Sequence, residues 1–394
     1  MPTRRINASV DRRDFLRGAA AAALPFFWSG GAALFAADDA HSAKLIPREL
    51  NPDNLEFPFA ALDKSITPNQ LFYVRNHFPQ PRLDKADWRL KVIGAVERPL
   101  ELTYDQLLDL PSVTRTVTLE CAGNGRAFLT PKAKGVQWEL GAVSTAEWTG
   151  VPLSKVLEKA GLRTEAMEVV LEGPDKGEPK NDAKPAGAIP FARSLPLAKA
   201  QKPEVLLAYK MNGAVLPEAH GFPLRAIVGG WYGMASVKWL TRIIVADRPF
   251  DGFFQGIEYA FWERRYGLPT LKAITEMDVK ASIAQPEAGA TVPANATVRV
   301  HGAAWAGESE PAKVEVSTDG GGTWAEAKLL GEGAPMAWRL WEFNWKTPAD
   351  GKRALMARAT DKRGRIQPME RDADRRSYRI SHVHPNEVVV RALR

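Results

Sequence analysis

The sequence contains one cysteine, Cys121, among 394 residues. A single cysteine cannot form an internal disulfide, and it excludes the paired cysteines of a covalently attached c-type haem. The chain also lacks a Walker loop, a GxGxxG turn after a strand and an HExxH motif. Cys121 is left as a buried small side chain, a free thiol or a metal ligand.

Basic residues form no continuous stripe along the chain, which argues against a nucleic-acid-binding surface. Residues 1–37 carry five arginines and two aspartates, so +3 of the formal +7 lies there and +4 lies in the remainder. This mild charge is compatible with docking to an acidic partner.

The N-terminus resembles a secretory leader. "DRRDFLR" at 11–17 pairs two arginines, and an uncharged, alanine-rich stretch from Gly18 to Ala37 follows. Pro25 and several glycines make this stretch a poor membrane-spanning helix. We therefore predict a twin-arginine signal peptide over 1–37, export of the folded protein to the periplasm and no membrane anchor after leader removal. Export after folding suits a protein that receives a cofactor first, and this favours a ligand role for Cys121 without deciding it.

Residues 38–272 read as a mixed α+β domain. Alternating strands are expected at 88–96 and 113–121, and a helix is expected at 151–162, where Gly161 stops it. The segment 172–188, rich in proline and glycine, predicts a polar loop. The strands are too irregular for a repeating βαβ layout.

Residues 273–394 change to short alternating segments separated by turns, and "STDGGGTW" (317–324) is a hairpin signal. This pattern predicts an immunoglobulin-like sandwich without the cysteine pair. Five tryptophans in this part are expected in the core or at a subunit interface rather than around a cofactor. They are Trp305, Trp324, Trp338, Trp341 and Trp345.

Four segments carry candidate site residues: "FYVRNHFP" (72–79), "CAGNGR" (121–126), "HGFPLR" (220–225) with "SVKWL" (236–240), and "FWERRYG" (261–267). Each alone has an ordinary explanation. An Arg-Asn-His cluster can be solvated, a loop histidine can be satisfied by its neighbours, and Lys238 can face solvent from a strand.

In this order, the segments resemble the sulfite oxidase family of molybdenum enzymes. The strings "RNH", "TLECAGN", "LLAYKMNG", "HGFPLR" and "VKWL" carry the resemblance, which runs from about Leu71 through the sandwich. It implies that Cys121 is a molybdenum ligand, that the metal carries a pyranopterin dithiolene, and that the sandwich forms a homodimer. Soft thiolates suit such a metal centre. Gly123 and Gly125 would let the backbone turn sharply beside the cofactor.

The resemblance also implies the remaining site residues. The pterin would lie among Tyr73, Asn76, His77, Cys121, Asp175, His220, Arg225, Ser236, Val237 and Lys238. Arg75, Arg126, Trp138 and Tyr266 would form the catalytic pocket for a sulfur oxyanion. Either Arg376 or Arg379 could add a further substrate arginine.

The implied reaction is periplasmic oxidation of sulfite to sulfate, with electrons passed to a separate c-type cytochrome, because no haem or flavin domain is expected in this chain. A sulfane dehydrogenase of a thiosulfate-oxidising system is the alternative. A methionine sulfoxide reductase is disfavoured, because those enzymes resemble the first domain alone. A non-catalytic binding protein would leave Arg75, Arg126 and Tyr266 unexplained.

Overall fold

The computed structural model describes residues 44–392. The predicted leader lies outside the described residues and stays a prediction. Within the described part, no helix combines the length and the apolar character needed to cross a membrane.

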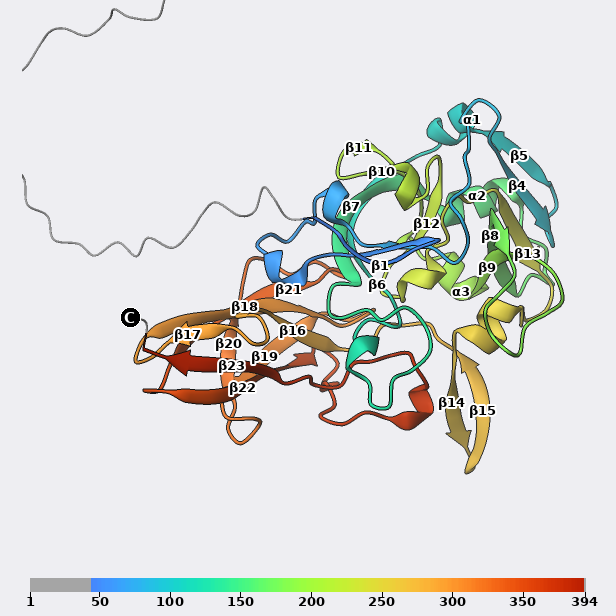
Figure 1. Ribbon diagram of the computed structural model, residues 1–394. Helices are drawn as coiled ribbons and strands as arrows, with labels where there is room; N and C mark the ends of the chain where they lie inside the picture. The colour runs from blue at the N-terminus through green and yellow to red at the C-terminus, as the bar shows by residue number, and fades with distance from the viewer. Residues whose placement is uncertain (1–43, 393–394) are drawn as a thin grey trace, which may run out of the picture. The chain divides into compact units, whose positions relative to one another are not determined.

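The N-terminal region, residues 44–273, is built mainly from two five-stranded sheets and a small three-stranded sheet (Figure 1). The first five-stranded sheet has the order β11-β10-β7-β6, and β12 also pairs with β10. Its strands are β6 (Val113–Glu120), β7 (Val143–Pro152), β10 (Val205–Met211), β11 (Ala214–Val215) and β12 (Arg225–Val228).

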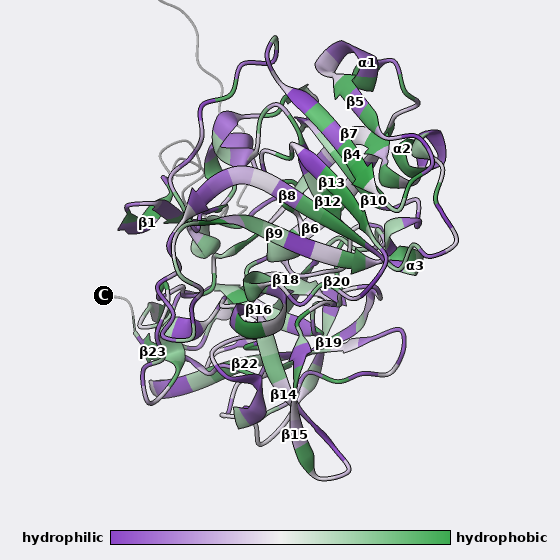
Figure 2. Cartoon of the chain, turned by 90° about the vertical axis from the view of Figure 1, so that its right-hand side faces the viewer, coloured by the Kyte–Doolittle hydropathy of each residue, from purple (hydrophilic) through white to green (hydrophobic). Residues whose placement is uncertain are grey.

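The second five-stranded sheet has the order β5-β4-β13-β8-β9, in which only β4 and β13 pair in parallel. Its strands are β4 (Arg89–Gly94), β5 (Leu100–Thr103), β8 (Glu168–Gly177), β9 (Ile189–Pro196) and β13 (Arg242–Ala246). The small sheet comprises β1 (Ile46–Leu50), β2 (Asp53–Glu56) and β3 (Val74–Arg75). Hydrophobic residues prevail in β13 (Figure 2), and its Ile243 is fully buried, as are Leu90 and Val92 of β4.

The few helices of this region are short. Helix α1 (Tyr104–Leu108) begins with a capping box, in which Thr103 Oγ1 accepts from Gln106 N and Gln106 Oε1 accepts from Thr103 N. Helix α2 (Leu153–Ala160) ends at Gly161, whose φ of +70° few other residues adopt. Helix α3 (Leu197–Ala200) forms one turn after β9. This fold confirms the predicted α+β class without a βαβ repeat.

Strand β8 shortens the predicted loop at 172–188 to residues 178–188, because it continues to Gly177 and pairs there with Ile189. The ladder shifts register between Glu172 and Lys176, where Pro174 lies. A bulge leaves residues of one strand unpaired and turns their side chains. The proline and glycine of this segment therefore mark a bulge, and it carries Asp175.

The C-terminal region, residues 280–392, is an eight-stranded sandwich with the order β16-β18-β21-β20-β19-β22-β23-β17. It confirms the predicted immunoglobulin-like fold, and β19 and β20 form the hairpin around "STDGGGTW". The strands are β16 (Lys280–Gln285), β17 (Thr291–Pro293), β18 (Thr297–Trp305), β19 (Pro311–Ser317), β20 (Ala325–Leu329), β21 (Arg339–Lys346), β22 (Gly351–Asp361) and β23 (Asn386–Arg391).

Four of the five tryptophans in the sandwich are buried and one, Trp324, is partly exposed beside Arg358. The four buried tryptophans are core residues, one of the two places predicted for them. Trp305 and Trp338 belong to the same apolar cluster as the N-terminal region. Because this cluster crosses residue 272, the predicted domain limits (38–272 and 273–394) stay predictions.

A two-stranded hairpin links the two regions and projects from them (Figure 1). It consists of β14 (Ala260–Arg265) and β15 (Leu268–Ala273), joined by Tyr266 and Gly267. A π-helix, Phe253–Glu258, precedes it, and Tyr259 lies between the π-helix and β14.

Candidate active site around Cys121

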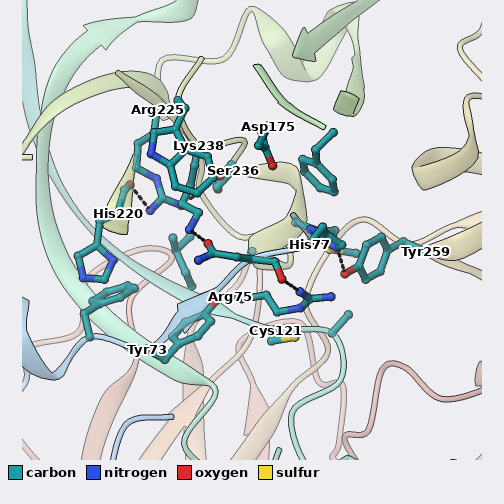
Figure 3. A pocket seen from close by; sticks show the side chains of 18 residues that line it. Tyr73, Arg75, His77, Cys121, Asp175, His220, Arg225, Ser236, Lys238 and Tyr259 are labelled. Carbon is teal, nitrogen blue, oxygen red and sulfur yellow. Dashed lines mark hydrogen bonds between the residues drawn. The ribbon is translucent and has the colours of Figure 1, made fainter. Parts of the chain in front are cut away.

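Cys121 lies directly after the last residue of β6, at the start of a tight turn. Cys121 N donates to Ala142 O at 2.8 Å, and Asn124 N donates to Cys121 O at 2.9 Å. Gly125 follows with φ +97°, a value that favours glycine. The thiol is 7% exposed and lines an internal pocket (Figure 3).

Gly123 has a different role from the one predicted for it. A Cβ at this position would lie 2.3 Å from a guanidinium nitrogen of Arg126. The missing side chain therefore makes room for Arg126, which folds back over the turn. Any larger residue at Gly123 would displace the arginine.

The pocket collects side chains from segments that lie far apart in the sequence. Ten of the residues expected around the site line it: Tyr73, Arg75, Asn76, His77, Cys121, Asp175, His220, Arg225, Ser236 and Lys238. In Figure 3, Cys121 lies on one side near Arg75 and Tyr73, while Arg225, Lys238 and Ser236 lie across the pocket from it.

Two cations on the far side have no acidic partner. Arg225 donates to His220 O at 2.8 Å and Ser236 O at 3.1 Å, and Lys238 Nζ donates to Ala219 O at 2.9 Å and to the side chain of Asn76. Within residues 44–392, no carboxylate oxygen lies within 4.0 Å of either side chain. Burial lowers the pKa of Arg225 to about 10 and, together with the charge of Arg225, lowers the pKa of Lys238 well below its usual range.

Buried charges without counter-ions are unfavourable, so this side of the pocket is suited to an anionic group. Guanidinium and ammonium groups are the usual ligands of phosphates. The terminal phosphate of a pyranopterin is an anion of this kind.

Asp175 offers a complementary acceptor. Its side chain is 6% exposed, and Oδ1 has no hydrogen-bond partner in the described chain. Burial raises the pKa of Asp175 from 3.8 to about 6, although the charge of Lys238 opposes the shift. An unpaired, buried carboxylate oxygen beside the pocket fits a ligand that supplies N–H donors, as a pterin ring does.

The two histidines of the pocket are neutral. His220 Nε2 donates to Asn69 O at 3.2 Å, which leaves Nδ1 as an acceptor, and burial lowers the pKa of His220 to about 3. His77 Nε2 lies 2.6 Å from Tyr259 Oη, and its ring stacks on Phe191 at 4.3 Å. Burial, and then the charge of Arg75, lower the pKa of His77 well below its usual range.

A second hollow adjoins the pocket at Cys121. The two share Arg75, Asn76, His77, Cys121 and Tyr259. The second hollow is also lined by Arg126, Arg376 and Tyr378, and its rim mixes acidic and basic side chains.

The three arginines of the second hollow hold mainly neutral oxygens. Arg126 donates to Val136 O at 2.8 Å and Ser377 O at 3.2 Å, and Arg376 donates to Ile257 O at 2.8 Å and Ala260 O at 2.9 Å. Within the described residues, none of the three has a carboxylate oxygen within 4.0 Å. The hollow beside Cys121 therefore offers three guanidinium groups without an ion-pair partner, which can take a small anion, although four carboxylates also line the hollow.

Arg376 and Arg379, which the sequence left as alternatives, separate in the structure. Arg376 lines the second hollow, whereas Arg379 forms a two-pronged ion pair with Asp278 at 2.7 and 3.0 Å. The geometry therefore favours Arg376 as the C-terminal arginine of the site.

Tyr266 was assigned incorrectly. Its side chain is completely exposed, at the tip of the β14–β15 hairpin. Tyr259 lies in the pocket instead, and burial raises its pKa to about 12, so that it keeps its hydroxyl proton. The Tyr-Gly pair at 266–267 could have shown that Tyr266 lies in a hairpin turn. Both residues have positive φ, as two-residue hairpin turns require.

Two further predicted residues lie behind the pocket wall. Trp138 is fully buried with its ring 6.5 Å from that of Tyr73, and it lines neither hollow. Val237 is also buried and accepts a backbone hydrogen bond from Ala226. Both support lining residues rather than face the pocket, so the direct wall role predicted for Trp138 is wrong.

The described residues offer no self-sufficient metal site, since none of them form a group of three or more His, Cys, Asp or Glu side chains that could hold an ion. Cys121 therefore stands alone as a candidate ligand. A metal bound here has to bring its other ligands with it, as a dithiolene cofactor does.

Comparisons with known proteins agree with this geometry. Residues 77–254 match the oxidoreductase molybdopterin binding domain, and residues 271–378 match the Mo-co oxidoreductase dimerisation domain. Sulfite oxidase of Gallus gallus is 37% identical over 357 residues, which cover 85% of this chain and 75% of that protein. The chain belongs to the sulfite oxidase family.

Two other relatives of this sulfite oxidase family member are informative. Mitochondrial sulfite oxidase of Rattus norvegicus is 39% identical over 336 residues, and the match covers 80% of this chain but only 60% of the rat protein. The crystal structure of the sulfane dehydrogenase SoxCD from Paracoccus pantotrophus matches with a TM-score of 0.74 and 27% identity, over 91% of this chain and 92% of that one. The family and the pocket chemistry together imply a molybdenum–pterin cofactor.

Proposed function

We propose that this protein oxidises sulfite to sulfate and passes the two electrons to a separate redox protein. The observation that carries the proposal is the hollow beside Cys121, where the unpaired guanidinium groups of Arg75, Arg126 and Arg376 come together. Sulfite is a small oxyanion, and arginine forks bind oxyanions through paired hydrogen bonds. The similarity to animal sulfite oxidases supports this choice of substrate.

The residues of the internal pocket would hold the cofactor. Cys121 would ligate the metal, Arg225 and Lys238 would neutralise the phosphate, and Asp175 and His220 would accept hydrogen bonds from the pterin. When bound, the cofactor supplies oxygen-atom transfer and accepts two electrons. The balanced reaction converts sulfite and water to sulfate, two protons and two electrons.

The chain's own residues then bind and orient the substrate. The arginines hold the oxygens of sulfite, so that the sulfur lone pair points toward the Cys121 side of the hollow. Tyr259 keeps its proton and can donate a hydrogen bond into the same space, and His77 fixes the tyrosine hydroxyl at 2.6 Å. Both products of the reaction step, sulfate and protons, leave through the wider, second hollow.

A sulfane dehydrogenase is the second candidate, supported by the similarity to SoxCD over nearly the whole of both chains. A methionine sulfoxide reductase is a weaker third candidate. Those enzymes resemble the first domain alone, whereas residues 271–378 of this chain match a dimerisation domain.

The location and the partners are also proposals. The paired arginines and the alanine-rich stretch in residues 1–37 support export to the periplasm by the twin-arginine route. A c-type cytochrome of that compartment would accept the electrons. The dimerisation-domain match supports a homodimer.

The test is to purify the full chain, measure molybdenum per chain by mass spectrometry, and follow reduction of ferricyanide and of cytochrome c with sulfite. We expect about one molybdenum per chain and sulfite-dependent reduction. Absence of molybdenum would contradict the cofactor. Molybdenum with no sulfite turnover, but with oxidation of a protein-bound persulfide, would favour the sulfane role.

A further inference from the structure

A buried ion pair joins the sandwich to the residue next to Cys121. Glu120 is the last residue of β6, and Lys280 is the first residue of β16. Lys280 Nζ lies 3.0 Å from Glu120 Oε1, and the two side chains are 5% and 2% exposed. We propose that Lys280 is a positioning residue for the Cys121 ligand, a proposal that rests on the cofactor assigned above.

Three donors hold the carboxylate of Glu120. Besides Lys280, Oε1 accepts from Asn124 Nδ2 at 3.1 Å, and Oε2 accepts from Trp305 Nε1 at 2.8 Å. Two of these three donors come from the sandwich, from β16 and β18. The carboxylate is therefore fixed from the side opposite to the pocket.

The same network reaches the turn that presents the thiol. Lys280 Nζ also donates to Asn124 O at 3.3 Å, and Asn124 Oδ1 accepts from Ala142 N at 3.1 Å. Asn124 N in turn donates to Cys121 O. The lysine thus holds both ends of the turn from Cys121 to Asn124, through Glu120 on one side and through Asn124 on the other.

Stability alone is a poor explanation for this ion pair. The desolvation of two buried charges offsets most of their attraction, and well-packed apolar residues often replace such pairs without loss. Outer residues that orient a metal ligand, by contrast, typically affect metal affinity or activity by about 10- to 100-fold. Because Glu120 is the residue next to Cys121, the ion pair is placed to orient the ligand rather than only to stabilise the fold.

The structure offers a matched control. Lys199 of α3 is equally buried, at 6% side-chain exposure, and pairs with Glu308 of the C-terminal region at 2.7 Å. It lines neither hollow and does not contact the Cys121 turn. Lys199→Met therefore reports the effect of losing a buried ion pair between the same two regions, away from the ligand.

The experiment compares Lys280→Met, Lys280→Arg and Lys199→Met with the wild type as full chains. Three readouts are measured: molybdenum per chain, the thiolate-to-molybdenum absorption band, and the rate at which a thiol reagent labels Cys121. The labelling is unambiguous because Cys121 is the sole cysteine of the sequence. It also works whether or not the preparation carries the cofactor.

We expect Lys280→Met to lose molybdenum or to shift the absorption band, to label about tenfold faster or more, and to lower kcat more than it raises the KM for sulfite. Lys280→Arg should recover part of each effect, and Lys199→Met should match the wild type. The double variant Glu120→Gln/Lys280→Met, which removes both charges, covers the case in which the single variant does not fold.

The proposal fails if Lys280→Met and Lys199→Met give the same labelling rate and the same absorption band as the wild type. A wild type that carries molybdenum but does not oxidise sulfite would contradict the proposed substrate and leave the labelling and absorption comparisons intact. A wild type without molybdenum would contradict the cofactor, and the labelling rate would then decide whether Lys280 holds the turn.

Discussion

Asp175 should make the cofactor-free protein less stable at neutral pH, and Asp175→Asn should relieve this effect. The side chain is buried on the β8 bulge, one of its oxygens has no partner in the described chain, and its pKa rises from 3.8 to about 6. An acid whose pKa is raised by folding is destabilising when ionised. The penalty is absent below pH 3.8, grows between the two pKa values and is complete above pH 6.

The magnitude follows from the shift. A difference of about two pKa units corresponds to about 3 kcal/mol of unfolding free energy at pH 8, and to about 1.5 kcal/mol at pH 5, where the folded state is mostly protonated. Asp175→Asn keeps the shape of the side chain and removes the charge. Its stabilisation of the cofactor-free chain should therefore be about 1.5 kcal/mol larger at pH 8 than at pH 5.

Denaturant unfolding of the cofactor-free, full-length chain at the two pH values measures this difference. Asp182→Asn is the matched control, because Asp182 lies on the neighbouring loop with its side chain 91% exposed. The control should change the unfolding free energy by less than about 0.5 kcal/mol at either pH. An Asp175→Asn gain that is zero, or equal at both pH values, would refute the reasoning.

The same variant should have the opposite effect on the loaded protein. If the carboxylate of Asp175 accepts hydrogen bonds from the pterin, the amide offers a weaker acceptor and places an N–H group against ring donors. Asp175→Asn should therefore lose cofactor faster on dilution, as followed by molybdenum retained after gel filtration. Equal retention by variant and wild type would remove Asp175 from the cofactor contacts.

Four further substitutions test the remaining assignments. Cys121→Ser should lose molybdenum and all turnover, as measured by mass spectrometry and ferricyanide reduction, and full activity in this variant would contradict the ligand. Arg75→Gln removes a charged donor worth about 1.5–3 kcal/mol, so the KM for sulfite should rise about 10- to 150-fold with a smaller change in kcat. Tyr259→Phe should lower kcat/KM about 5- to 100-fold, whereas Tyr266→Phe should leave it unchanged, and the reverse pattern would restore the original assignment.

Local sequence signals predicted much of the fold because they depend on neighbouring residues. Gly161, expected to stop the helix at 151–162, ends α2 with a positive φ. The sandwich was predicted from the alternation of apolar and polar residues in 273–394 and from the hairpin signal "STDGGGTW". The predicted loop at 172–188 is present over 178–188 but begins later than expected, because proline and glycine mark bulges as well as loops and only pairing with β9 separates the two.

The site was harder to predict where long-range packing decides the outcome. Arg126 follows Gly125 in sequence, but its fold back over Gly123 depends on acceptors at Val136 and Ser377. Tyr266 was chosen through the resemblance of "FWERRYG" to the family's active-site segment, yet no residue of the hairpin, 260–273, lines either hollow. Tyr259, the residue directly before the hairpin, lines the pocket instead.

The period of a β-strand explains why one strand end can serve both regions of the protein. Successive side chains of a strand point to opposite faces, so Cys121 and Glu120 face opposite ways at the end of β6. Cys121 faces the pocket, and Glu120 meets Lys280 and Trp305 of the sandwich. A shift of one residue in the register of β6 would place the carboxylate in the pocket and the thiol against the sandwich. The ion pair therefore selects the register that presents the thiol, because the alternative would bury Lys280 without a counter-ion.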